Sequence, residues 1–211
     1  MTAKVSAVSA EAGQSAPESG SSGDRAAAVA ARLFAAKGYS ATTTRELSAA
    51  LGVTNGTLYH HFESKEALLL LLCNESLSRI TSEVAAAVGE THEPRGRLAT
   101  LIRAHVVTML RDQDLHKTML TELRSLSGDN LEAVKGRRDD YSRFVREVIE
   151  EEQTAGAVRG DIPAKTLALL LLNMLNWTIF WFRPDGDLRP AELADAIVST
   201  FLDGAAATAA R

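Results

Sequence analysis

The 211-residue chain contains one cysteine and five prolines, and aromatic residues make up only 5% of it. A single cysteine cannot form an intramolecular disulfide, which fits a reducing cytoplasm. Cys73 lies in an apolar run and is expected to be a core residue rather than a redox sensor. Strand-like runs of valine, isoleucine, threonine and tyrosine are also scarce, whereas leucine and alanine are abundant. This composition predicts an all-α protein.

The sequence also lacks segments that would direct the chain to a membrane. Residues 1–23 have no continuous apolar stretch of the kind that a signal peptide requires. The longest apolar run, Leu167 to Phe182, is interrupted by Asn173 and Asn176 and is shorter than the roughly 20 residues of a membrane span. We therefore expect a cytoplasmic protein with no membrane partner.

A net charge of −4 means that bulk charge does not draw the protein to nucleic acid. The sequence has no glycine-rich phosphate loop, metal-ligand cluster or nucleophile–base spacing, so we predict no catalytic residue, no cofactor and no metal site. His60 and His61 are neighbours on a predicted helix and diverge by about 100°, which prevents them from sharing a metal ion. Two alternatives stay open: a non-catalytic helical interaction protein, and an enzyme that uses a C-terminal cavity.

Apolar spacing divides the chain into a small N-terminal helical domain, 24–70, and a larger helical bundle, 71–211. Residues 1–23 show no helical stripe and are expected to form a disordered arm, either a plain tail or an arm that touches the minor groove. Asp24 is expected to cap the first helix, and Gly38 to end it. The later helices are expected at 43–51, 54–61, 65–88, 95–111, 114–126, 129–154, 163–182 and 190–203.

The most informative segment, residues 42–69, reads TTTRELSAALGVTNGTLYHHFESKEALL. Its apolar residues Leu47, Leu51, Val53 and Leu58 are expected to form a small core with Phe34 of the first helix. Gly52 supplies the positive φ that a tight turn between two helices requires. The helix 54–61 then has an outward face of polar side chains and one glycine: Thr54, Asn55, Gly56, Thr57, Tyr59 and His60. This is the geometry of a helix-turn-helix, in which such a face fits the major groove of DNA.

Some of these side chains have the donor and acceptor pattern that reads duplex DNA. Asn55 can pair with adenine, and Arg45, at the start of the preceding helix, can pair with guanine. Thr57 and Tyr59 can donate hydrogen bonds to phosphate without adding charge. The expected partner of this domain is therefore double-stranded operator DNA.

Over about residues 26–72 the chain resembles the DNA-binding domain of the TetR family, above all in TTRELSAALGVTNGTLYHHFESKEALL. The hallmarks are the Gly-Val turn, the Thr-Leu-Tyr-x-x-Phe recognition helix and the lysine that opens the next helix. The resemblance implies a transcriptional repressor. It also implies phosphate contacts from Thr44, Thr57, Tyr59, His61 and Lys65. The residues it places at base edges are Arg45, Asn55, Gly56 and His60.

Helix-turn-helix units usually bind as dimers to half-sites about 34–36 Å apart, so the bundle should supply an interface. The helix 163–182 is apolar nearly all round, and the helix 190–203 adds a second apolar stripe. We expect two copies to form a four-helix bundle and a homodimer, with completion of the protomer core as the alternative. The expected interface residues are Leu167, Leu171, Leu175, Phe182, Leu193, Ile197 and Phe201.

The interior of the bundle is a candidate ligand cavity, because methionine and aromatic side chains line adaptable apolar cavities. The expected lining residues are His105, Met109, Met119, Leu123, Phe144, Asn173, Trp177 and Trp181. An ordinary core would use most of them as well, and His105 fits a satisfied core histidine as well as a polar ligand anchor.

The C-terminal stretch NWTIFWFRPDGDLRPAELADAI is similar to a TetR subgroup linked to fatty-acid or sterol breakdown. This similarity implies a small, largely apolar effector, such as an acyl-CoA. The cations expected near its phosphates are Arg97, Arg103 and Arg183. The helix 65–88, which touches both domains, is the expected link between ligand and DNA.

Overall fold

The computed structural model describes residues 22–91, 93 and 96–205, with the backbone alone at 22–24, 61, 204 and 205. The predicted arm, 1–23, lies outside this part of the chain except for its last two residues, which already belong to the first helix. Asp24 is therefore inside a helix and does not cap it, contrary to the sequence prediction. Within the described residues, no helix is long and apolar enough to cross a membrane.

The described chain forms nine α-helices, which confirms the predicted all-α fold. The first three are α1 (Ser22–Lys37), α2 (Thr44–Leu51) and α3 (Asn55–His61). The others are α4 (Lys65–Gly89), α5 (Arg97–Arg111), α6 (Gln113–Glu122), α7 (Gly128–Thr154), α8 (Ala164–Trp181) and α9 (Pro190–Ala205). The segment 114–126, predicted as one helix, ends instead in a 3₁₀ turn, η1 (Leu123–Ser125).

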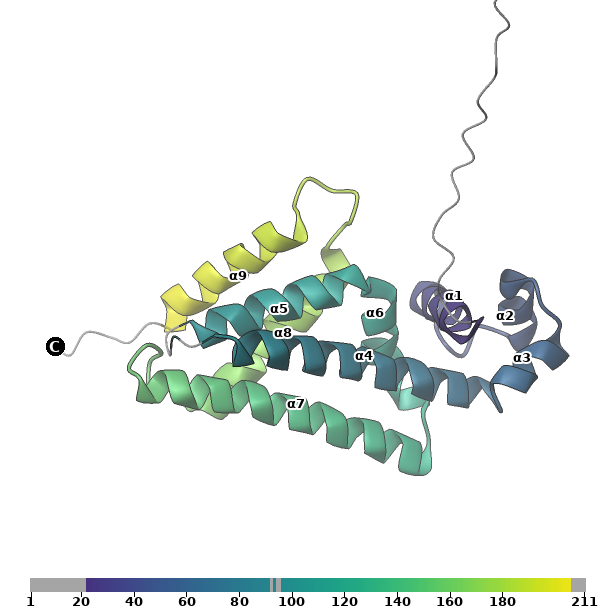
Figure 1. The fold of residues 1–211 in the computed structure, drawn as a ribbon, viewed down its shortest axis with the longest axis horizontal. Helices are drawn as coiled ribbons and strands as arrows, with labels where there is room; N and C mark the ends of the chain where they lie inside the picture. Colours follow the sequence, from purple (N-terminus) through teal and green to yellow (C-terminus); the bar gives the residue numbers. More distant parts are fainter. Residues whose placement is uncertain (1–21, 92, 94–95, 206–211) are drawn as a thin grey trace, which may run out of the picture.

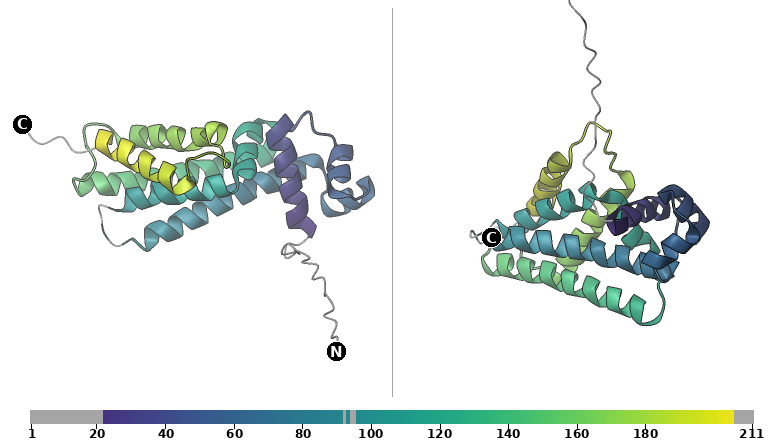
Figure 2. Two further views of the ribbon diagram at one scale, coloured as in Figure 1. Left: turned by 90° about the horizontal axis from the view of Figure 1, so that it is seen from above. Right: turned by 45° about the vertical axis from the view of Figure 1, so that its right-hand side comes forward.

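The three N-terminal helices lie at one end of an elongated molecule, and α4 runs from them along the helical bundle (Figure 1). The long helix α7 lies beside α4, and α5 contacts both α4 and α9. Two further views show α1–α3 at the same end of the bundle (Figure 2). Helix α6 stands between these parts and packs against α1. It is therefore positioned to connect them.

Two hydrophobic clusters form the core. The first joins the C-terminal half of α4 to α5, α7, α8 and α9, and it includes Leu101, Val145 and Leu175, which are fully buried. The second joins α1–α3 to the N-terminal half of α4, and it also takes in α6, η1 and the start of α7. Cys73 is buried in the second cluster, as predicted. The N-terminal helices thus share their core with the helical bundle.

Candidate DNA-binding surface and ligand cavity

The second helix of the predicted motif is fixed at both ends. Thr43 caps α2, because its side chain accepts from the backbone N–H of Glu46 while the Glu46 carboxylate accepts from the N–H of Thr43. Lys37 pairs with the same carboxylate, and these contacts lower the pKa of Glu46 to about 2. Gly52 ends the helix with a φ of 68°, as the predicted turn requires.

The small core of the motif is confirmed except at one position. Leu47 and Leu58 are buried beside Phe34, and Leu51 packs against them while half-buried. Val53 is 37% exposed and does not join this core. It comes directly after Gly52 in the turn, where the chain has left α2 and not yet entered α3.

The third helix presents the predicted polar face. Thr54 caps α3 by accepting from the backbone N–H of Thr57, and the hydroxyls of the two threonines are 3.0 Å apart. Tyr59 is 49% exposed, and His60 and Gly56 are exposed as well. A Cβ built on Gly56 would meet nothing closer than 3.7 Å, so its lack of a side chain is not imposed by packing.

Asn55, the predicted reader of adenine, is held by a residue of the preceding helix. The buried Ser48 Oγ donates to the Asn55 Oδ1 over 2.6 Å and also lies 2.9 Å from the Thr44 carbonyl. With Oδ1 engaged, the Nδ2 amide of Asn55 is the donor left for a base. Arg45 is exposed on the same helix as Ser48, and Thr44 is half-buried. The sequence analysis singled out Arg45 and Asn55 but not the serine that holds the Asn55 amide.

Lys65 and His61 are the other two predicted phosphate contacts. The Lys65 Nζ donates to the Thr42 carbonyl over 2.7 Å and lies 4.1 Å from the centre of the Tyr39 ring. Burial lowers the pKa of this ammonium group. Lys65 is thus already anchored to the loop before α2, and it keeps further N–H donors for a phosphate. The side chain of His61 lies outside the described residues.

The bundle contains a cavity of about 160 Å³ between α4, α5, α6, α7 and α8. Four of the eight predicted residues line it: His105, Met109, Met119 and Asn173. The other lining residues were not predicted: Leu77, Ile80, His116, Leu120, Arg138, Tyr141, Ser142, Leu169, Leu172 and Asn176. The cavity volume is similar to that of an engineered cavity that holds benzene, about 150 Å³.

The other four predicted residues do not line this cavity. Leu123 is buried in the cluster around α1–α3, and Phe144 packs against the main core without lining the cavity. Trp177 and Trp181 are 64% and 50% exposed on the outer face of α8. Arg97 and Arg103 do not reach the cavity and pair with acidic residues, as Arg183 does. The cation that lines it is Arg138.

Two histidines lie in the cavity wall, each bonded to a hydroxyl group. The Nδ1 of His105 is 2.7 Å from the hydroxyl of Tyr141, and the Nδ1 of His116 is 2.8 Å from the hydroxyl of Ser76. Burial lowers the pKa of His105 to about 3 and that of His116 to about 4. Both rings are therefore neutral near pH 7.

The predicted interface residues belong to the protomer core. Every one of them is buried within a single chain, which corrects the sequence prediction: Leu167, Leu171, Leu175, Phe182, Leu193, Ile197 and Phe201. The opposite face of α8 carries exposed apolar residues instead: Leu169, Leu170, Met174, Trp177, Phe180 and Trp181. The rings of Trp177 and Phe180 lie 4.8 Å apart on this face.

Helices α1–α3, with a fixed turn and an exposed polar recognition face, define a helix-turn-helix DNA-binding protein. Residues 27–72 match the family described as bacterial regulatory proteins, tetR family. Residues 91–205 match the family described as tetracyclin repressor-like, C-terminal domain. Because the second match covers more than half of the chain, the protein belongs to the TetR family of transcriptional regulators.

Relatives of known structure and role agree with this assignment. The chain is 28% identical to the transcriptional repressor KstR2 of Rhodococcus jostii RHA1, over 84% of this chain and 88% of that protein. The structure of PfmR, a TetR-family regulator from Thermus thermophilus, is 33% identical and aligns with a TM-score of 0.79, covering 85% and 98% of the two chains. AibR, solved with isovaleryl coenzyme A and operator DNA, is 27% identical with a TM-score of 0.75, covering 85% and 97%.

Proposed function

We propose that the protein is a cytoplasmic transcriptional repressor that binds palindromic operator DNA as a homodimer and is released by a small, largely apolar effector. The observation that carries the proposal is the surface of α2 and α3. Arg45 and Asn55 lie exposed on adjacent helices, with Tyr59 beside them on α3. Arginine has the donors that read guanine, asparagine has the donor and acceptor that read adenine, and tyrosine can donate to phosphate.

The exposed apolar face of α8 supports a homodimer. A monomeric soluble protein rarely exposes several large apolar side chains side by side, and two tryptophans and a phenylalanine lie here on one helix. A second copy is the occupant we propose, because a palindromic operator requires two recognition helices related by a two-fold axis. Trp177, Phe180 and Trp181 would form the centre of that contact.

The cavity supports release by an effector, because two of its lining residues also belong to the core of the DNA-binding helices. Leu77 of α4 and Met119 of α6 line the cavity and pack in the cluster that holds α1–α3. A ligand that displaces either side chain would disturb that cluster. Since protein interiors are close-packed, such a displacement is transmitted rather than absorbed.

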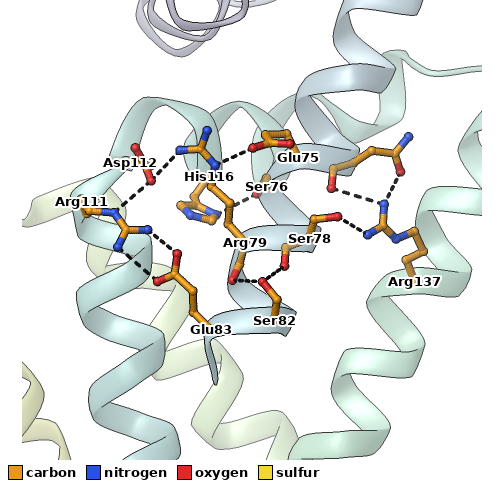
Figure 3. A network of polar contacts seen from close by, with 11 residues as sticks. Glu75, Ser76, Ser78, Arg79, Ser82, Glu83, Arg111, Asp112, His116 and Arg137 are labelled. Atoms are coloured by element: carbon orange, nitrogen blue, oxygen red, sulfur yellow. Dashed lines mark hydrogen bonds and ion pairs between the residues drawn. The ribbon is translucent and has the colours of Figure 1, made fainter. Parts of the chain in front are cut away.

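Polar contacts hold α6 against α1 and α5 against α4. Thr118 of α6 donates to the Ala31 carbonyl of α1 over 3.0 Å, in a buried setting. Figure 3 shows Arg79 of α4 between Glu75 and Asp112, and Arg111 of α5 paired with Glu83. These ion pairs are partly exposed, so they orient the helices more than they stabilise them.

A second set of polar contacts joins α4 to α6 and α7. Figure 3 shows the Ser76 hydroxyl of α4 bonded to His116 of α6, and Arg137 of α7 bonded to Ser78 of α4. These contacts hold α6 and α7 against α4. Helix α4 is the helix that the sequence analysis expects to link the ligand to DNA. The effector acts by binding more tightly to a conformation whose recognition helices no longer match successive major grooves, so operator affinity falls by at most that difference in affinity.

The test is binding of the full chain to a duplex from its own promoter region, measured by fluorescence anisotropy at several salt concentrations. We expect preference over a scrambled duplex and a steep loss of affinity as salt rises. Arg45→Ala should cost about 1–3 kcal/mol of that preference, whereas Arg143→Ala, an exposed arginine on α7, should change nothing. An equal affinity of wild type for both duplexes at low salt would favour a non-catalytic interaction protein instead.

A further inference from the structure

The side chain of Asn55 offers only part of its hydrogen-bonding capacity to DNA. Asn55 is the exposed first residue of α3, and among the described residues its side chain makes one hydrogen bond, to Ser48 of α2. The Ser48 Oγ lies 2.6 Å from the Asn55 Oδ1 and 2.9 Å from the Thr44 carbonyl oxygen. Both neighbours are acceptors, whereas a serine hydroxyl has a single proton. The neighbour that receives this proton decides which atoms of Asn55 are left for a base.

The contacts of the two acceptors assign the proton to Asn55. As the carbonyl four residues before Ser48 in α2, that of Thr44 already accepts the backbone N–H of Ser48 in the α-helical pattern. The Asn55 Oδ1 has no other donor among the described residues, and it lies nearer to the hydroxyl. Without a proton between them, two acceptor oxygens would face each other over 2.6 Å. The Ser48 hydroxyl is buried, so little water competes for this bond.

This bond changes the base edge that suits Asn55. An asparagine amide with both atoms free reads adenine, because it accepts from the N6 amino group and donates to N7. The Oδ1 of Asn55 lies against the buried Ser48 hydroxyl, so the Nδ2 hydrogens are what remains for DNA. Adenine would then place its amino group against another NH₂ group, donor against donor. Guanine presents two acceptors at this edge, N7 and O6, whereas thymine presents one and cytosine presents a donor.

We propose that Ser48 restricts Asn55 to donating, so that Asn55 binds guanine rather than adenine in the operator. Ser48 is buried and acts through Asn55, so it is a positioning residue and does not itself touch DNA. The inference rests on the proposed function, because it names the base that one residue of the same surface reads. It also gives a base preference that the residue type alone does not, since a free asparagine favours adenine.

The first experiment selects binding sites for the full-length wild type from randomised duplexes and then measures single base-pair changes by fluorescence anisotropy. The position that Asn55 reads is the one whose preference disappears in Asn55→Ala while the other positions keep theirs. There the wild type should prefer a G·C pair in one orientation over an A·T pair in either orientation, by at least about fivefold.

Three results of this experiment overturn the inference. One is a preference for an A·T pair at the position that depends on Asn55. Another is the absence of any such position, including an equal loss on all sequences in Asn55→Ala, which would indicate a phosphate contact. In both cases the proposed repressor survives. Selection of no sequence by the wild type is the third, and it overturns the proposed function as well.

The second experiment tests the role of Ser48. In Ser48→Ala the freed Oδ1 lets Asn55 pair with adenine too, so the preference for G·C over A·T should narrow to within about twofold. The preference at the position identified in the same way for Arg45 should stay unchanged, which a general loss of structure would not allow. Ser82→Ala, on the exposed face of α4, is the control. An unchanged preference in folded Ser48→Ala, or an equal loss at both positions, overturns the inference.

A measurement on the wild type without DNA tests the direction of the bond even if Ser48→Ala does not fold. Solvent exchange of the two Nδ2 hydrogens of Asn55 is measured by NMR. Both should exchange as in an exposed amide, because neither is donated within the protein. Protection of one hydrogen by more than about tenfold would mean that Asn55 donates to Ser48. The Oδ1 would then be free to read adenine, which overturns the inference.

Discussion

Thr118 in α6 donates a buried hydrogen bond of 3.0 Å to the carbonyl oxygen of Ala31 in α1. This bond joins a helix of the cavity wall to a helix of the DNA-binding end without passing through α4. Helix α6 also carries His116 and Met119, which line the cavity. One short helix thus contacts both the proposed ligand and the proposed DNA-binding domain.

Replacing Thr118 with valine should loosen α1. The substitution keeps the shape but leaves the Ala31 carbonyl without this donor, so the free energy of unfolding should fall by about 1–2 kcal/mol. Backbone amides of α1 should exchange faster with solvent in hydrogen-exchange experiments. Thr121→Val is the matched control, since that hydroxyl is exposed and bonds within its own helix. Equal exchange of α1 in both variants would contradict the role of this bond.

Ser48→Ala should weaken sequence preference more than it weakens DNA binding as such. Without the Ser48 hydroxyl, the amide of Asn55 is free to rotate and present the wrong atom to a base. We expect a loss of about fivefold to tenfold on the promoter duplex, at the lower end of the range of one base contact, and little change on a scrambled duplex. Ser82→Ala is the control, because Ser82 lies exposed on α4. A similar loss on both duplexes would argue against an orienting role for Ser48.

Trp177→Asp should convert the protein to a monomer, because a carboxylate buried at the centre of an interface is strongly unfavourable. Sedimentation equilibrium measures the mass directly, and circular dichroism checks the helix content. Val53→Asp is a suitable comparison, since it places the same charge on an exposed apolar residue far from α8. A wild-type protein that is already monomeric at micromolar concentration would rule out the proposed homodimer.

The free energy of unfolding should decrease as the pH falls below about 6.5. Burial holds the pKa of His105 near 3 and that of His116 near 4, so the unfolded chain takes up protons in this range and the folded chain does not. Stability is complete above the ordinary pKa and is lost with acidification, by about 2 kcal/mol for each ring at pH 5.

Urea unfolding at near-neutral and mildly acidic pH measures this loss. The lowered pKa of Glu46 and Glu66 places their titration at lower pH, outside the range compared. His116→Gln should remove part of the dependence, since glutamine carries no titrating ring. A wild type equally stable at both pH values would show that the rings are not buried as described.

The sequence predicted local structure well, because caps, turn glycines and apolar periodicity act over a few residues. Gly38 and Gly52, for example, take the predicted positions at the ends of their helices. The capping box of Thr43 and Glu46 was not predicted, although Thr-x-x-Glu is visible in the sequence. Helix α8 was harder, since a helix that is apolar all round has no preferred face. Which side packs inward depends on its neighbours, so Leu171 is buried and Trp177 is exposed.

The cavity was only half predicted for a similar reason. His116 and Arg138 lie on helices whose polar residues mostly face solvent, and nothing in their spacing distinguishes them from surface residues. Their place in the lining depends on the crossing of α6 and α7 with α4. Such long-range geometry has no local signature in one sequence.

The shared cluster around α1–α3 also bears on how this protein could be engineered. Leu115, Met119 and Leu123 complete the packing of the N-terminal helices, although they follow them by many residues in the chain. A chimaera joined near residue 70 would pack helices α1–α3 against the side chains of a foreign C-terminal domain. To transfer its operator specificity to another ligand-binding domain, α6 and η1 would therefore have to be transferred as well. Otherwise the contact that they make with α1–α3 would have to be redesigned.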